Sequence, residues 1–152
     1  MKRGLILVLI VLFSLLLSGC SKSGKQAVYT GPPLNDVEFA KRVFSLLAEG
    51  DEAVLVMVDW AHLKMIGVDV GTMYLNISGD SARDKFLKGF ISGYSKSFKE
   101  RGGTVDNVSN WREHSRDASN TVVTADGPGG KPLLMTVAHI DGQQKVTNLE
   151  LK

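Results

Sequence analysis

The sequence has very little cysteine and no excess of either charge once its first residues are set aside. Cys20 is the only cysteine among 152 residues, which excludes an internal disulfide. There are 18 basic and 16 acidic side chains, and Lys2 and Arg3 account for the difference. The neutral remainder lacks the basic surface of a nucleic-acid-binding protein. The composition also excludes a collagen, a coiled coil and a polytopic membrane protein.

The sequence also lacks the motifs that are typical of catalytic and cofactor-binding sites. None of the three histidines, His62, His114 and His139, is paired with another at metal-ligand spacing. Ser92 sits in a helical pattern and not in a G-x-S-x-G elbow, and the glycine-rich stretch 127–131 lacks the spacing of a phosphate-binding loop. We therefore assign no catalytic residue, metal or cofactor from the sequence.

What the sequence does contain is a hydrophobic leader over residues 1–19. Two basic residues precede an apolar run from Leu5 to Leu17, interrupted only by Ser14. Thirteen helical residues at about 1.5 Å each span roughly 20 Å, which is shorter than a hydrocarbon core of about 30 Å. The run therefore predicts a signal peptide and not a stable transmembrane helix.

The leader ends in Leu17-Ser18-Gly19-Cys20, which resembles the lipobox of bacterial lipoproteins. The resemblance implies cleavage between Gly19 and Cys20, lipid attachment to the Cys20 thiol and anchoring to the membrane. Ser21 at the next position implies transfer to the outer membrane, facing the periplasm. An ordinary secretory leader with an incidental cysteine is the alternative. Residues 20–34 are rich in Ser, Lys, Gly and Pro, and we expect a flexible tether.

A single domain is expected over residues 35–152, with its helices first. Asn35 and Glu38 form a capping box for a helix that should end at Gly50. The apolar run after Asp51 fits a second short helix or a buried strand, and we favour the helix. A long amphipathic helix follows, capped within residues 81–84 and ended by Gly102-Gly103.

Strands should make up the rest of the chain. Polar residues 112–116 follow Trp111, and β-branched or alternating runs occupy residues 121–125, 133–140 and 145–151, with Thr147, Leu149 and Leu151 on one face. Asp141-Gly142 is a strong hairpin signal. The pattern predicts an α+β fold, in which a curved antiparallel meander of about four strands packs against the long helix.

The order of these elements resembles the cystatin-like or nuclear-transport-factor-like α+β cone, with Glu49-Gly50-Asp51 after the first helix. The resemblance covers residues 35–152 and implies a homodimer as one arrangement. It does not select a function, because this fold hosts isomerases, dehydratases, binding pockets and interaction modules.

Five residues are the candidates for a ligand site. Phe86, Phe90 and Tyr94 recur on one face of the long helix, and Trp111 precedes the polar strand, so these four either wall a pocket or fill the core. Asp59 interrupts an apolar run and is either a buried, functional carboxylate or a helix cap at the surface. Isomerases of the cone fold pair a carboxylate base with a Tyr hydroxyl, so the resemblance makes Asp59 with Tyr74 or Tyr94 the candidates for such chemistry. His114 and His139 are further candidates.

Three functions remain open. The sequence favours a non-catalytic domain that binds an envelope protein or acts as a scaffold. A pocket for a small apolar ligand or lipid is the second, and an acid–base isomerase or dehydratase is the third. An open apolar cavity of roughly 300 Å³ or more would favour the second.

Overall fold

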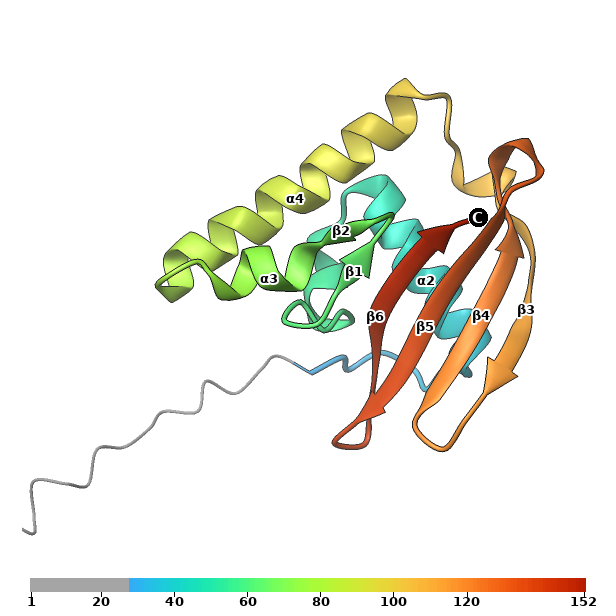
Figure 1. Cartoon of the computed structure of the whole chain (residues 1–152), viewed down its shortest axis with the longest axis horizontal. Coiled ribbons are helices and arrows are strands. Elements are labelled where there is room, and N and C mark those ends of the chain that lie inside the picture. The colour runs from blue at the N-terminus through green and yellow to red at the C-terminus, as the bar shows by residue number, and fades with distance from the viewer. Residues whose placement is uncertain (1–27) are drawn as a thin grey trace, which may run out of the picture.

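The computed structural model describes residues 28–152, and Figure 1 shows them as helices beside one twisted sheet. The predicted leader, the lipobox and Cys20 lie outside the described residues. The α+β class is confirmed. The sheet has six strands in the order β2-β1-β6-β5-β4-β3 and is not closed.

The first described helix, α2 (Asp36–Glu49), begins and ends as the sequence predicted. The Asn35 side chain accepts a 2.9 Å hydrogen bond from the Glu38 amide, which satisfies one of the free amides of the first turn. Gly50 ends the helix with a φ of 81°, a conformation that costs glycine little.

Four long strands form the predicted meander. They are β3 (Ser109–Arg116), β4 (Asn120–Asp126), β5 (Pro132–Ile140) and β6 (Gln143–Leu151), each antiparallel to the next. Asp141 and Gly142 both have positive φ, so the predicted two-residue hairpin turn is confirmed. The pairing of β5 with β6 skips Thr147, since Thr136 lies opposite Asn148 and Val137 lies opposite Val146. Val146, and not Thr147, is therefore buried together with Leu149, and the prediction that Thr147 shares a face with Leu149 is wrong.

The helix that covers the sheet is α2, and not the long helix as predicted. Phe39, Val43 and Leu47 of α2 are completely or almost completely buried against strand residues such as Met135 and Val137. Each large side chain buried in this way contributes about 1.5–3 kcal/mol. Among the described residues, the buried hydrophobic side chains run from Phe39 to Leu149, so both ends of this part of the chain contribute to one core.

Residues 51–79 fold only partly as expected. A 3-10 turn, η1 (Glu52–Val56), takes the place of the favoured helix, and the strands β1 (Lys64–Met65) and β2 (Val68–Asp69) follow. The β1 strand runs parallel to β6, which makes the sheet mixed. The short helix α3 (Val70–Leu75) completes this segment.

The long helix α4 (Asp80–Glu100) is confirmed, although its start differs from the prediction. Gly79 occupies the N-cap position, and no side chain from residues 81–84 caps the helix. Figure 1 shows α4 above the sheet and beside α2, α3 and η1. The 3-10 turn η2 (Val105–Asn107) leads from it into β3, and a third, η3 (Pro128–Gly130), joins β4 to β5.

Candidate apolar binding cavity

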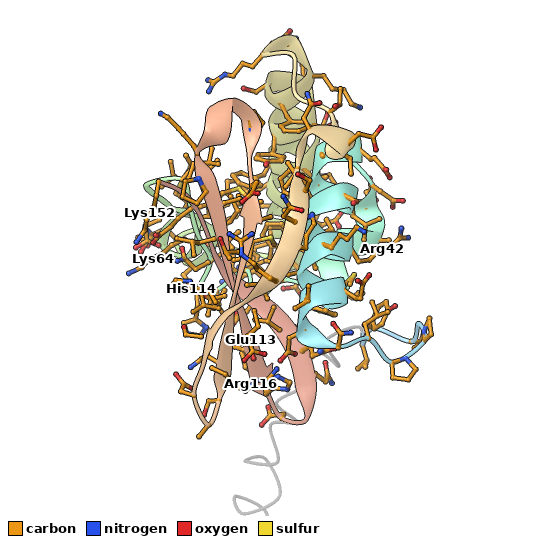
Figure 2. The ribbon with its side chains drawn as sticks, turned by 90° about the vertical axis from the view of Figure 1, so that its right-hand side faces the viewer. Arg42, Lys64, Glu113, His114, Arg116 and Lys152 are labelled. Carbon is orange, nitrogen blue, oxygen red and sulfur yellow. The ribbon has the colours of Figure 1, made fainter. Side chains whose placement is uncertain are left out.

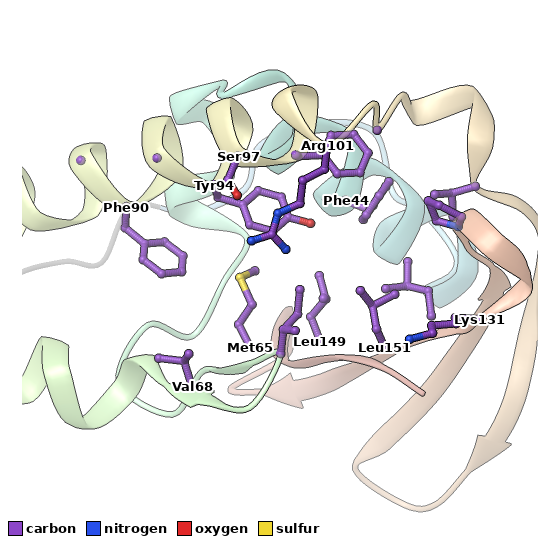
Figure 3. A pocket seen from close by; sticks show the side chains of 18 residues that line it. Phe44, Met65, Val68, Phe90, Tyr94, Ser97, Arg101, Lys131, Leu149 and Leu151 are labelled. Atoms are coloured by element: carbon purple, nitrogen blue, oxygen red, sulfur yellow. The ribbon is translucent and has the colours of Figure 1, made fainter.

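An open cavity of about 720 Å³ lies below α4. Its other walls are the β1–β2 hairpin, the ends of β5 and β6, and the turn at η3. Figure 3 shows Met65 and Leu149 below the cavity and Phe90 and Tyr94 above it. The volume lies within the usual range of small-molecule sites, about 300–1,000 Å³.

The cavity exists because α4 rests on α2 and leaves part of the sheet uncovered. Leu87, Ile91 and Ser95 recur every four residues on one face of α4 and are buried. The Ser95 hydroxyl donates a 2.8 Å hydrogen bond to the Ala48 carbonyl at the end of α2. This contact positions α4 on α2, away from the uncovered end of the sheet.

A second face of α4 forms the ceiling of the cavity. Phe90, Tyr94, Ser97 and Arg101 follow one another at three- or four-residue spacing, and all of them line the cavity. Gly89 and Gly93 also line it, and a Cβ added at either position would meet no atom within 4 Å. Both glycines are exposed, so the cavity is open to solvent along this part of α4.

Most of the lining is apolar. Leu133, Leu149 and Met65 are buried side chains that extend from the core, whereas Ile66 and Val68 are about half exposed at the hairpin. Burial raises the pKa of the Tyr94 hydroxyl to about 12, so this group stays neutral at physiological pH. The lining suits an apolar ligand.

Two of the five predicted site residues, Phe90 and Tyr94, line the cavity, and the other three do not. The Phe86 ring packs 6.2 Å from the Phe90 ring, outside the lining. Trp111 packs against Phe44, with ring centroids 5.6 Å apart. Its indole N–H donates a hydrogen bond to the Val108 carbonyl, and its ring covers the core instead of lining the cavity.

Asp59 lies away from the cavity as well. Its carboxylate is 2.8 Å from Nδ1 of His62, and neither residue lines the space below α4. His114 and His139 do not line it either, so the described lining contains Tyr94 but no carboxylate and no imidazole. The arrangement that an acid–base isomerase would need is therefore not assembled in this cavity.

Sequence reasoning missed a buried carboxylate cluster at the other end of α2. The Asp36 carboxylate is 4 % exposed and accepts hydrogen bonds from Thr121 Oγ1 at 2.6 Å and Gln144 Nε2 at 2.7 Å. His139 Nε2 and an Arg116 terminal nitrogen each lie 3.0 Å from it. The sequence showed only an acid in a first helical turn, because the partners are 80 or more residues away.

The surroundings of Asp36 keep it ionised. Burial acts to raise the pKa of Asp36, but hydrogen bonds from Thr121, Gln144 and His139 together outweigh burial and lower it. Arg116 also pairs with Glu113 at 2.8 Å, and Figure 2 shows these two side chains close together at one end of β3. We interpret the cluster as a structural tie between α2 and the sheet.

No family model, curated protein or solved structure matches this chain. In residues 28–152, no group of three or more His, Cys, Asp or Glu side chains is placed to hold a metal ion. The same residues include no helix with the length and apolar character needed to cross a bilayer.

Proposed function

We propose that this protein binds a small apolar ligand in the cavity below α4 and is held at the bacterial cell envelope by a lipid on Cys20. The cavity carries the ligand-binding part of the proposal, since its volume exceeds the roughly 300 Å³ expected of a small-molecule site. An interaction or scaffold domain, which the sequence favoured, would have no need of such a space.

The positions of Gly89 and Gly93 support ligand binding over a packing defect. Glycine inside a helix costs about 0.5–1 kcal/mol relative to alanine. Here two glycines, four residues apart, face the same open space. Alanine would fit at both positions, so the glycines leave the rim of the cavity wide at the expense of helix stability.

The membrane anchor rests on the lipobox resemblance at Leu17-Ser18-Gly19-Cys20. We also propose that the domain is related to the cystatin-like or nuclear-transport-factor-like cone. A helix across an antiparallel four-stranded meander supports that relation, whereas the parallel β1–β6 pairing is an addition to it.

Binding of the neutral fluorophore N-phenyl-1-naphthylamine tests the cavity directly. Residues 28–152, which include the core cluster and every residue that lines the cavity, are used without detergent, because detergent would compete for an apolar site. We expect saturable binding with increased fluorescence. Gly93→Phe places a ring in the open space and should weaken binding by about tenfold or more, equivalent to about 1.4 kcal/mol.

The matched control is Ser92→Phe, which adds the same ring to the neighbouring, exposed position outside the cavity. It should leave binding unchanged. Thermal unfolding of both variants verifies that they fold. The absence of saturable binding to the wild-type chain, or equal binding by Gly93→Phe and wild type, would contradict the proposal.

A further inference from the structure

The charged groups of the cavity are distributed unevenly. Among the described lining residues, Arg101 and Lys131 carry the only formal charges, and both are positive. They come from different parts of the chain, the end of α4 and the turn between η3 and β5. Figure 3 shows the Arg101 guanidinium reaching into the cavity from above, with Lys131 on the opposite side near Leu151.

Neither cation has an acidic partner within residues 28–152. Five other Lys or Arg side chains of these residues form ion pairs, for example Lys88 at 3.3 Å from Glu52 and Arg116 at 2.8 Å from Glu113. The remaining ones do not, and among these Arg101 and Lys131 are the two that border the apolar space, where both are exposed. Two unpaired cations beside a largely apolar surface are complementary to an anionic group attached to an apolar chain.

From this arrangement we infer that the ligand is an anionic amphiphile, whose carboxylate or phosphate head lies at the Arg101 guanidinium, with Lys131 adding positive charge at the same cavity. Its alkyl chain lies along Phe90 and Met65 towards Val68 at the hairpin. This inference rests on the proposed function and narrows its ligand class. A guanidinium binds an oxyanion with two parallel hydrogen bonds, and the ammonium of Lys131 adds a point charge.

A purely structural role for Arg101 is the competing explanation. Arg101 is the C-cap residue of α4, where a cation interacts favourably with the helix dipole. That role would affect the stability of α4 and would not distinguish one ligand head group from another. Head-group preference at constant chain length therefore separates the two roles.

The test uses four ligands with the same ten-carbon chain: decanoate, decyl phosphate, decanol and decyltrimethylammonium. Each displaces N-phenyl-1-naphthylamine from residues 28–152 at pH 7.5, below its micelle concentration. We expect at least one anion to bind about three- to tenfold more tightly than decanol, the range for partly exposed, charge-assisted contacts. Decyltrimethylammonium should bind most weakly.

The double variant Arg101→Gln/Lys131→Gln should lose the preference and bind the anions and decanol with equal affinity. The control Lys96→Gln/Lys85→Gln removes two charges from exposed positions of α4 outside the cavity and should keep the preference for anions. Comparing the preferred anion, decanoate or decyl phosphate, identifies the head group.

Two results would overturn the inference in different ways. If decanol binds as tightly as both anions, or if the double variant retains the preference, the head-group assignment is wrong and the apolar cavity remains a binding site. If none of the four ligands displaces the fluorophore, the proposed function fails together with the inference. In cells, a photoreactive fatty acid should cross-link to the full wild-type chain in higher yield than to the full chain with the double substitution.

Discussion

The Ser95 hydroxyl donates a 2.8 Å hydrogen bond to the carbonyl of Ala48, and this bond ties the middle of α4 to the end of α2. The last carbonyls of a helix have no partner within the helix. In α2, the Leu46 and Leu47 carbonyls are satisfied by the Gly50 amide. Ser95, together with Lys99 at 3.4 Å from the Glu49 carbonyl, satisfies the next two.

Replacing Ser95 with alanine should therefore weaken the contact between the two helices. The buried Ala48 carbonyl loses its partner, which costs about 1 kcal/mol, and the better helix propensity of alanine offsets roughly 0.5 kcal/mol of that. Ser92→Ala is the matched control, since Ser92 is exposed and forms no such bond. Urea unfolding should place Ser95→Ala about 1 kcal/mol below Ser92→Ala. Equal stability would show that the bond contributes nothing.

Alanine at the two cavity glycines should have the opposite effect. Gly89→Ala and Gly93→Ala should each raise the free energy of unfolding by about 0.5–1 kcal/mol, because the added Cβ meets no atom within 4 Å. Gly50→Ala is the contrasting variant. Its φ of 81° and the Ser95 Cβ at 3.1 Å from the added Cβ should make it destabilising by roughly 1–2 kcal/mol.

Urea unfolding of these three variants checks the prediction. Destabilisation by Gly89→Ala or Gly93→Ala would mean that the ceiling of the cavity is closed in solution and that the argument from open space is wrong.

The Asp36 cluster should make stability depend on acid pH. The folded-state pKa of Asp36 is lowered, so its contribution to stability is fully present above the unfolded pKa of about 3.9. It is lost as the pH falls through the lower folded value. We expect Asp36→Asn to lose about 1–3 kcal/mol at pH 7, because a buried charged acceptor is replaced while Thr121 and Gln144 remain.

Urea unfolding of wild type and Asp36→Asn between pH 7 and pH 3 measures this difference. The two curves should converge towards the acid end, because below the unfolded pKa of about 3.9 the unfolded wild-type chain takes up a proton that the folded chain binds more weakly. A constant difference across this range would exclude ionisation of Asp36 as the source of the stabilisation.

The anchor proposal makes a prediction for the full chain in a bacterial host. Cys20→Ser removes the thiol needed for lipid attachment and should abolish labelling with radioactive palmitate. More than one acyl chain is needed for stable anchoring, so the variant should also leave the membrane fraction. Ser18→Thr keeps Cys20 and is a control that should still be labelled. Unchanged labelling of Cys20→Ser would exclude the lipoprotein proposal.

Local signals in the sequence were enough to predict the elements that depend on neighbouring residues. Asn35 and Gly50 bound α2 because a side-chain cap and a left-handed glycine act within one turn. Asp141 and Gly142 form the hairpin because their positive φ values match the twist of the strands they join. The α4 periodicity likewise showed that one face is apolar, but it did not show which surface that face contacts.

Tertiary structure alone decided what these elements enclose. It placed α2, and not α4, on the sheet, and so left the space lined by Phe90 and Tyr94 open. It also brought Arg101 and Lys131 to one cavity and Thr121 to Asp36, 85 positions apart. Periodicity and caps act over three or four residues, whereas a cavity or buried cluster depends on how separate elements pack. For this protein the sequence determined α2, α4, the four meander strands and the Asp141-Gly142 turn, whereas the packing of α4 on α2 determined the site.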